Sequence, residues 1–210
     1  MILAHRGTWE ETNEQNTLNS FQISLKLGVG IETDLRDFNG EVIISHDIPI
    51  KKTLCLDDFF ELWKKNTLNS YLALNIKSDG LGELLLKYIN KYKINNYFLF
   101  DMSIPETKKY RDLGLKYFIR ISEFEQDTAF LEESSGVWLD CFDSEWYEKN
   151  LIERFLDEGK IISLVSPELH QRPYICQWKK IKEMNLPWKD GKVLLCTDHP
   201  YEAKEFFNEI

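Results

Sequence analysis

The first 47 residues, MILAHRGTWEETNEQNTLNSFQISLKLGVGIETDLRDFNGEVIISHD, contain the start of a repeated strand-and-helix pattern. Residues 1–4 are apolar and predict a strand. Apolar side chains recur at helical spacing between positions 18 and 27, which predicts a helix. Residues 31–47 are predicted to form a second strand and a hairpin with an Asn-Gly turn. This order of elements predicts an α/β fold.

The same alternation continues through the rest of the chain. Further strands are predicted at residues 71–77, 97–100, 116–122, 136–140, 161–165 and 192–196. The helices predicted between and after them cover residues 57–65, 81–92, 105–114, 144–159, 175–184 and 200–207. Eight strand-and-helix units, with no run of strands alone, predict a closed parallel (β/α)₈ TIM barrel. We expect residues 1–210 to form it as one domain, with short loops because the chain is small for this fold.

The composition limits the partners of this protein. The chain has 210 residues, of which 43% are hydrophobic, and a formal net charge of -9. Nucleic acid is excluded as a partner because its binding depends on Lys and Arg, whereas a small anionic substrate can bind where a metal ion reverses the charge locally. No apolar run is long enough to span a bilayer, so we expect a cytoplasmic location. The four cysteines lie far apart, which favours reduced thiols over a zinc site.

Polar residues with catalytic chemistry follow the first predicted strands. His5 and Arg6 lie at the end of the first strand, and His46 lies at the end of the hairpin. Glu32 and Asp34 are two residues apart in the second strand, so their carboxylates point to the same side. In a TIM barrel the C-terminal ends of the strands meet at one face, which holds the active site. We therefore predict an active site built from these residues at that face.

A divalent cation would relieve the repulsion between the Glu32 and Asp34 carboxylates. Oxygen ligands without cysteine favour Mg²⁺ or Ca²⁺ over Zn²⁺. His5 and His46 suit proton transfer near neutral pH, because an unperturbed histidine has a pKa of about 6.5. Each group alone is more often structural, but their combination at adjacent strand ends favours a functional site.

These motifs resemble, in this order, those of the glycerophosphodiester phosphodiesterase family. The resemblance covers nearly the whole chain and rests on His-Arg-Gly at 5–7, Asn-Thr at 16–17, Ile-Glu-Thr-Asp at 31–34, His-Asp at 46–47, Leu-Asn-Ile-Lys at 74–77 and Cys-Thr-Asp-His-Pro at 196–200. It implies a TIM barrel of the phospholipase-C-like phosphodiesterase type that releases an alcohol and glycerol 3-phosphate. It also implies that the two histidines serve as acid and base, and that the two acidic residues of the second strand bind the metal ion.

Arg6 and Lys77 are predicted to add fixed positive charge at the phosphate. Two positions depart from the family pattern: Gln15 stands where the family has Glu, and Asn75 stands where the family has a metal-binding Glu. Asn75 can still coordinate through its amide oxygen, but with one negative charge fewer. Four acidic residues could compensate, Asp101 and Glu168 first and then Glu14 and Asp140. The alternative is a metal-poor site.

The loop after the seventh predicted strand is rich in functional groups. Loops at this position often bind phosphate in TIM barrels, so we predict that His170 or Arg172 contacts the substrate. Arg120 lies between two isoleucines of the fifth strand, and we predict an internal ion pair with Asp140 or Glu123.

The predicted function is a metal-dependent phosphoric diester hydrolase that acts on a glycerophosphodiester or a similar small phosphodiester with Mg²⁺ or Ca²⁺. The alternative is a non-hydrolytic barrel that binds a phosphorylated sugar or headgroup, which Gln15 and Asn75 favour. A third function is a lyase that uses the same histidines to form a cyclic phosphate. The sequence leaves open which histidine is the acid, which metal binds, and what the alcohol portion of the substrate is.

Overall fold

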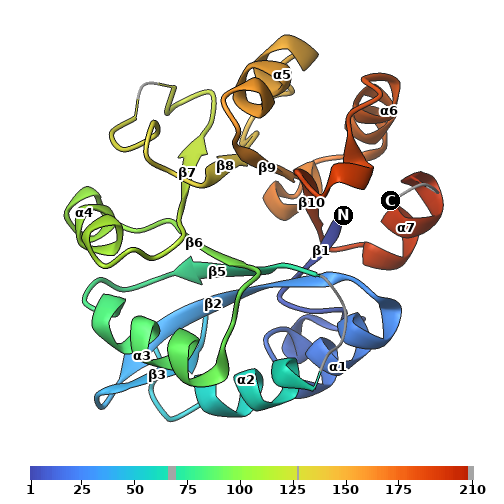
Figure 1. Cartoon of the computed structure of the whole chain (residues 1–210). Coiled ribbons are helices and arrows are strands. Elements are labelled where there is room, and N and C mark those ends of the chain that lie inside the picture. Colours follow the sequence, from blue (N-terminus) through green and yellow to red (C-terminus); the bar gives the residue numbers. More distant parts are fainter. Residues whose placement is uncertain (66–69, 127, 208–210) are drawn as a thin grey trace.

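The computed structural model describes residues 1–65, 70–126 and 128–207. Within these residues eight parallel strands form a closed barrel, which helices surround in Figure 1. In barrel order the strands are β1 (Ile2–His5), β2 (Gly30–Phe38), β5 (Leu72–Ile76), β6 (Tyr97–Phe100), β7 (Phe118–Ile121), β8 (Gly136–Leu139), β9 (Ile161–Val165) and β10 (Val193–Thr197), which pairs with β1. The predicted TIM barrel is therefore confirmed.

Closure between β6 and β7 depends on little pairing. Among the described residues a single parallel bridge joins Leu99 to Tyr117, and the Leu99 amide donates to the Lys116 carbonyl at 3.0 Å. The neighbouring strands β5 and β6 are instead paired along four residues each. The β6–β7 seam, defined by this bridge, is thus the least extensively paired junction of the barrel.

Side chains alternate between the inside and the outside of the barrel, as the pleat of each strand requires. Aromatic residues dominate the inside: the Phe98 and Phe118 rings stack with centroids 3.7 Å apart, and the Phe100 and Trp138 rings stack at 4.0 Å. The outward side chains pack against the helices in a separate, larger cluster. Side chains therefore fill the inside of the barrel, and the polar groups at the C-terminal ends of the strands lie next to these aromatic rings.

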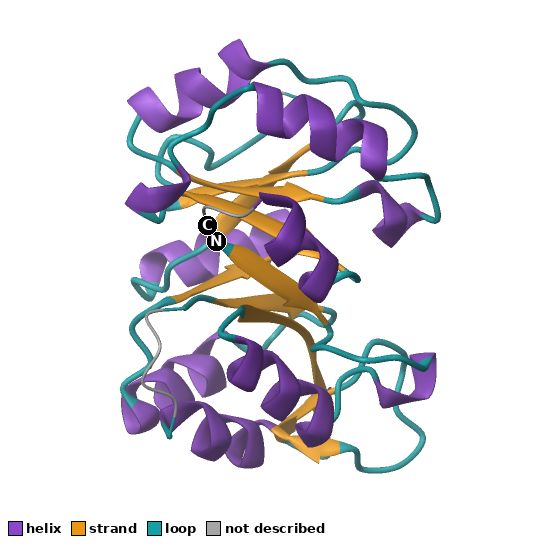
Figure 2. Ribbon diagram, turned by 90° about the vertical axis from the view of Figure 1, so that its right-hand side faces the viewer, coloured by secondary structure: helices purple, strands orange, loops and turns teal. Residues whose placement is uncertain are grey.

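Seven α-helices lie outside the strands in the described residues, and the side view of Figure 2 shows the strands running between them. They are α1 (Leu18–Leu27), α2 (Leu56–Lys64), α3 (Gly82–Tyr92), α4 (Ile104–Asp112), α5 (Lys149–Asp157), α6 (Ile175–Glu183) and α7 (Pro200–Phe207). The start of α1 shows how the sequence sets these bounds. The Thr17 hydroxyl accepts a hydrogen bond from the Ser20 amide, and Gly28 ends the helix with a φ of 79°.

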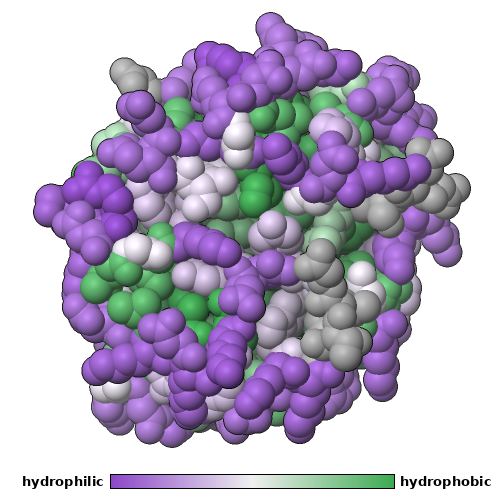
Figure 3. Space-filling view, viewed as in Figure 1, coloured by the Kyte–Doolittle hydropathy of each residue, from purple (hydrophilic) through white to green (hydrophobic). Residues whose placement is uncertain are grey.

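Shorter elements complete the chain. The hairpin strand β3 (Glu41–Ile44) and the two-residue strand β4 (Leu54–Cys55) extend the sheet from β2 in the antiparallel direction. Three turns of 3₁₀-helix are η1 (Thr12–Glu14), η2 (Pro167–His170) and η3 (Trp188–Asp190). On the face that Figure 3 shows, hydrophilic residues form most of the rim and hydrophobic residues appear nearer the centre. Among the described residues, no helix combines the length and apolar character that crossing a bilayer would require.

Two details of the predicted pattern were wrong. The connection from β7 to β8 contains no helix within residues 122–126 and 128–135, so only seven of the eight expected units have their own helix. Helix α5 begins at Lys149 and not at Ser144. The Glu123 carboxylate accepts hydrogen bonds from the amides of Phe142, Asp143 and Ser144, and these bonds hold that segment in an extended turn.

Candidate active site

A cavity of about 280 Å³ opens at the C-terminal ends of the barrel strands. The apolar part of its lining consists of Phe100, Trp138, Phe142, Val165 and Leu169, and the remaining lining residues are polar or charged. The structure brings together at this cavity most of the side chains predicted for the site, namely His5, Arg6, Glu32, His46, Asn75, Lys77, Asp101 and His170, together with Arg120 and Asp140. We call this the central cavity.

His5 ends β1 and is held on both sides by carboxylates. Its Nδ1 donates to Asp198 Oδ1 at 2.7 Å, which leaves Nε2 on the side of Glu32, 3.8 Å from Oε2. Burial lowers the pKa of His5, but the Asp198 hydrogen bond and the Glu32 charge outweigh it and raise that pKa above its ordinary value. The imidazolium form is therefore favoured. Asp198 was not among the predicted site residues, although it lies in the quoted motif at 196–200 and directly follows β10.

Asp34 is a buried carboxylate that two cations share. Its Oδ2 lies 2.9 Å from Arg6 Nε and accepts a 2.9 Å hydrogen bond from Asn16, while Lys77 Nζ lies 3.3 Å from Oδ1. Burial alone would raise the pKa of Asp34, but Arg6, Lys77 and Asn16 together lower it. Gln15, at the position that departs from the family pattern, accepts a hydrogen bond from Arg6 Nη1 at 3.1 Å. Gln15 therefore orients the arginine.

Glu32 has the opposite electrostatic character. Its side chain is 1% exposed, and its only neutral hydrogen-bond donor in the structure is the Arg6 amide at 3.2 Å. Burial, followed by repulsion from Asp34, raises the pKa of Glu32 to about 7. A buried carboxylate in this state gains stability from any cation that approaches it.

The donor set around Glu32 is compatible with a hard divalent cation. Asn75 pairs with Asp34 in the β2–β5 register, and Glu32 lies two residues before Asp34 on the same face. Oδ1 of Asn75 and Oδ1 of Asp34 are both buried without a hydrogen-bond partner. Two carboxylates and one amide oxygen are ligands that Mg²⁺ and Ca²⁺ accept. Within the part of the chain that the structure describes, no three His, Cys, Asp or Glu side chains gather as a metal cluster.

Arg120 and the acidic residues on the far side of the cavity are paired differently from our prediction. Arg120 Nε donates to Asp101 Oδ1 at 3.0 Å, so the predicted pairing with Asp140 or Glu123 was wrong. Asp140 instead accepts a 2.6 Å hydrogen bond from His170 Nε2. Asp101 and Asp140 therefore lie at the cavity, as expected, but each is already paired, Asp101 with Arg120 and Asp140 with His170.

His46 lies just after β3 with its side chain 47% exposed. Its Nδ1 donates to Asp47 Oδ1 at 2.8 Å, and its ring contributes to the same cavity as His5. The two imidazoles therefore share one space, as the sequence motifs predicted they would.

Four predicted residues do not line the cavity. One is Asp34, which is fully buried and pairs with Arg6 and Lys77. The other three hold loops in place. The Glu168 carboxylate accepts hydrogen bonds from the hydroxyls of Ser166 and Thr197 and from the Asp198 amide. Arg172 Nη1 donates to the Cys141 carbonyl at 2.8 Å. Glu14 accepts from the amides of two preceding residues, Glu10 and Glu11. These contacts position loops, so the structure places none of the three side chains where a cation or phosphate would sit.

Comparison with known proteins gives one kind of match. No protein-family model and no curated protein matches the sequence. A solved structure of a proposed glycerophosphodiester phosphodiesterase from Galdieria sulphuraria is similar, with 18% identity, a TM-score of 0.78 and coverage of 99% of this chain and 97% of that chain. A glycerophosphodiester phosphodiesterase from Agrobacterium tumefaciens has 12% identity and a TM-score of 0.70, with coverage of 100% and 99%.

A phosphodiesterase from Oleispira antarctica, solved in complex with the product sn-glycerol-3-phosphate, has 13% identity and a TM-score of 0.67, with coverage of 99% of this chain and 96% of that chain. At such identities the likeness shows that the fold is shared over the full length. The predicted barrel of the phosphodiesterase type is thereby confirmed as a fold.

Proposed function

We propose, from the fold that this chain shares with glycerophosphodiester phosphodiesterases, that it is a phosphoric diester hydrolase. One observation carries the proposal: His5, His46, Arg6 and Lys77 meet around a buried carboxylate, Glu32, at the end of the barrel where TIM-barrel enzymes react. The Oleispira antarctica phosphodiesterase was solved with sn-glycerol-3-phosphate. We transfer that product class to this chain, so the substrate is a glycerophosphodiester or a similar small phosphodiester.

Arg6 and Lys77 hold the phosphoryl group in this proposal. Their side chains are 19% and 21% exposed, so each retains a surface toward the cavity while it contacts Asp34. A phosphodiester carries one negative charge, and charge-assisted hydrogen bonds from these cations would fix its non-bridging oxygens. The Asp34 carboxylate keeps both cations in place and so preorganises the phosphate site.

The two histidines divide the proton transfers. His46 takes a proton from the attacking hydroxyl, which belongs to water or to a neighbouring group of the substrate, as the new phosphorus–oxygen bond forms. His5 is the general acid: its raised pKa favours the imidazolium, and Nε2–H gives its proton to the departing alkoxide as the old phosphorus–oxygen bond breaks. Asp198 holds the His5 ring and stabilises its charge.

Glu32, Asp34 and Asn75 would hold the Mg²⁺ or Ca²⁺ ion. When bound, such an ion supplies positive charge that offsets the charge of the phosphoryl oxygens. The buried Asn75 Oδ1, which has no hydrogen-bond partner, and the raised pKa of Glu32 support this assignment. The metal assignment can be tested without substrate: Mg²⁺ or Ca²⁺ should raise the Tm of the protein, and Glu32→Gln should reduce this increase.

A second candidate is the non-hydrolytic barrel that binds a phosphorylated sugar or headgroup. It is favoured by the engagement of Asp34 with Arg6 and Lys77, which competes with a cation for the same carboxylate. Such a protein would be stabilised by glycerol 3-phosphate but would show no turnover with any metal.

The test is hydrolysis of glycerophosphocholine by purified protein with Mg²⁺, with Ca²⁺ or with a chelator, followed by phosphorus NMR. We expect glycerol 3-phosphate to form, and His5→Ala to lower the rate by about 10²- to 10⁴-fold. His199→Ala is the matched control, because His199 lies at the same end of the barrel but stacks on Tyr174 outside the cavity. A cyclic phosphate would identify the lyase, and no turnover in the wild type would refute the hydrolase.

A further inference from the structure

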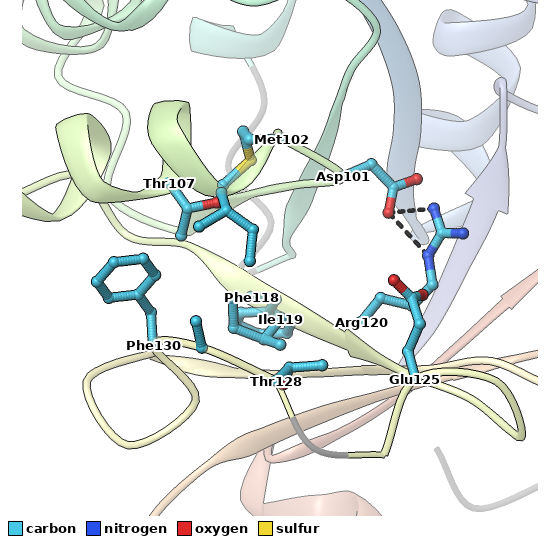
Figure 4. A pocket seen from close by; sticks show the side chains of 11 residues that line it. Asp101, Met102, Thr107, Phe118, Ile119, Arg120, Glu125, Thr128 and Phe130 are labelled. Carbon is cyan, nitrogen blue, oxygen red and sulfur yellow. Dashed lines mark hydrogen bonds and ion pairs between the residues drawn. The ribbon is translucent and has the colours of Figure 1, made fainter.

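A second cavity, of about 200 Å³, adjoins the central cavity. Asp101 and Arg120 line both spaces, and Figure 4 shows their ion pair at one side of the second cavity. The two cavities therefore meet at this ion pair. We call the second space the side cavity.

The side cavity occupies the position of the missing helix. In the other seven units a helix covers the outside of the strand, but residues 122–126 and 128–135 cross from β7 to β8 as a loop, visible between α4 and α5 in Figure 1. The outward side chain of β7, Ile119, consequently faces this loop and lines the side cavity. The space is thus a product of the barrel architecture and lies directly outside the strand that carries Arg120.

Six of the eleven lining residues are apolar: Met102, Ile104, Phe118, Ile119, Ala129 and Phe130. The other five are the Asp101–Arg120 pair, Glu125, Thr107 and Thr128. The Phe130 ring is fixed by the Arg111 guanidinium, which lies 5.0 Å from its centroid. The Thr128 hydroxyl is buried without a hydrogen-bond partner, whereas the Thr107 hydroxyl donates to the Ser103 carbonyl. The apolar part of this lining suits an apolar group, whereas the charged residues Asp101, Arg120 and Glu125 also line the cavity.

We infer that the side cavity binds the alcohol portion of the substrate, and that this portion is a short alkyl or aryl group. The inference rests on the proposed hydrolase function, with the phosphoryl group at the central cavity. A side cavity of about 200 Å³ suits such a group but not a whole lipid acyl chain. Arg120 then lies beside the ester oxygen that joins the two parts.

The first test is a series of glycerol 3-phosphate esters with methyl, ethyl, propyl and butyl alcohols. If each added methylene is buried, kcat/KM should rise about fourfold per methylene, and so about sixtyfold from methyl to butyl. A flat series with measurable hydrolysis of the methyl ester overturns the side-cavity assignment but leaves the hydrolase standing. If no ester is hydrolysed, both fall together.

The second test uses two matched variants. Ile104 and Ile175 are each the first residue of a helix and exposed, but only Ile104 lines the side cavity. Aspartate is tolerated in the first turn of a helix, so both variants should fold. Ile104→Asp should lower the butyl-to-methyl ratio of kcat/KM by tenfold or more, whereas Ile175→Asp should leave the ratio within twofold. Equal losses would show a general effect of charge near the barrel mouth and would overturn the assignment.

A third variant predicts a gain. Thr128→Val replaces the partnerless hydroxyl with a methyl group of the same shape, so the lining becomes more apolar. The butyl-to-methyl ratio should rise at least threefold, a result that poor folding could not produce. A fall in the ratio would contradict the inference.

Discussion

Glu32 is expected to destabilise the metal-free protein while serving its activity. The pKa of Glu32 in the folded protein is about 7, compared with 4.5 for an ordinary glutamate. Between these two values the folded protein binds more protons than the unfolded chain, so the free energy of unfolding falls as pH rises. A difference of about 2.5 pKa units corresponds to a loss of about 3 kcal/mol, complete above pH 7 and absent below pH 4.5.

Replacement of Glu32 by Gln removes this titration and keeps an oxygen that accepts from the Arg6 amide. In the presence of a chelator, Glu32→Gln should therefore be more stable than the wild type by about 3 kcal/mol at pH 8 and about equal to it near pH 4.5. The assay is urea unfolding at intervals of half a pH unit. Mg²⁺ or Ca²⁺ should narrow the difference at pH 8, because the ion stabilises only the wild-type carboxylate strongly.

Glu123→Gln is the control with the opposite sign. Burial alone would raise the pKa of Glu123, but three backbone amides that donate to its carboxylate lower it. Its contribution to stability is therefore present above pH 4.5 and is lost as pH falls, so Glu123→Gln should be less stable than the wild type at pH 8. A stability difference for Glu32→Gln that does not change with pH, or that is destabilising at pH 8, would refute the reasoning.

Three further predictions concern the same cavity. His5→Ala should lower the rate much less with a p-nitrophenyl ester than with an alkyl ester, because the p-nitrophenolate leaving group needs no proton. His46→Ala should lower the rate with both esters alike. Equal rate losses for the two variants would remove the acid and base assignment. Asp198→Asn removes a group that raises the pKa of His5, so the alkaline limb of the kcat/KM profile should move to lower pH, and an unmoved limb would show that His5 is not the acid. Asn75→Glu adds a negatively charged oxygen ligand and should raise the affinity for Ca²⁺ by about tenfold or more. Titration calorimetry measures this affinity, and an unchanged value would place the cation elsewhere.

The architecture was predictable because strand periodicity and strand ends are local properties of the sequence. The alternation of side chains placed Glu32 and Asp34 on one face, and the C-terminal strand ends brought His5 and Lys77 to the same cavity. The sequence pattern placed no helix between residues 122 and 136, and the error lay in counting eight complete units where only seven helices were assigned.

The pairing of side chains was less predictable, because it depends on register across the closed barrel. His5 and its partner Asp198 are 193 residues apart in sequence. Asp140 and Glu123 were the predicted partners of Arg120, but the arginine instead pairs with Asp101, which follows the neighbouring strand β6. Glu168 lies in the expected loop, but its carboxylate turns toward Thr197 and away from the cavity.

The seam between β6 and β7 gives the Asp101–Arg120 ion pair a second role. Asp101 directly follows β6, and Arg120 belongs to β7, so the pair spans the junction that has only one backbone bridge. The ion pair therefore adds a side-chain link at the C-terminal end of these two strands. Without this ion pair the barrel should open locally between β6 and β7 more often, so a substitution at Arg120 should lower local stability and also change the side-cavity wall.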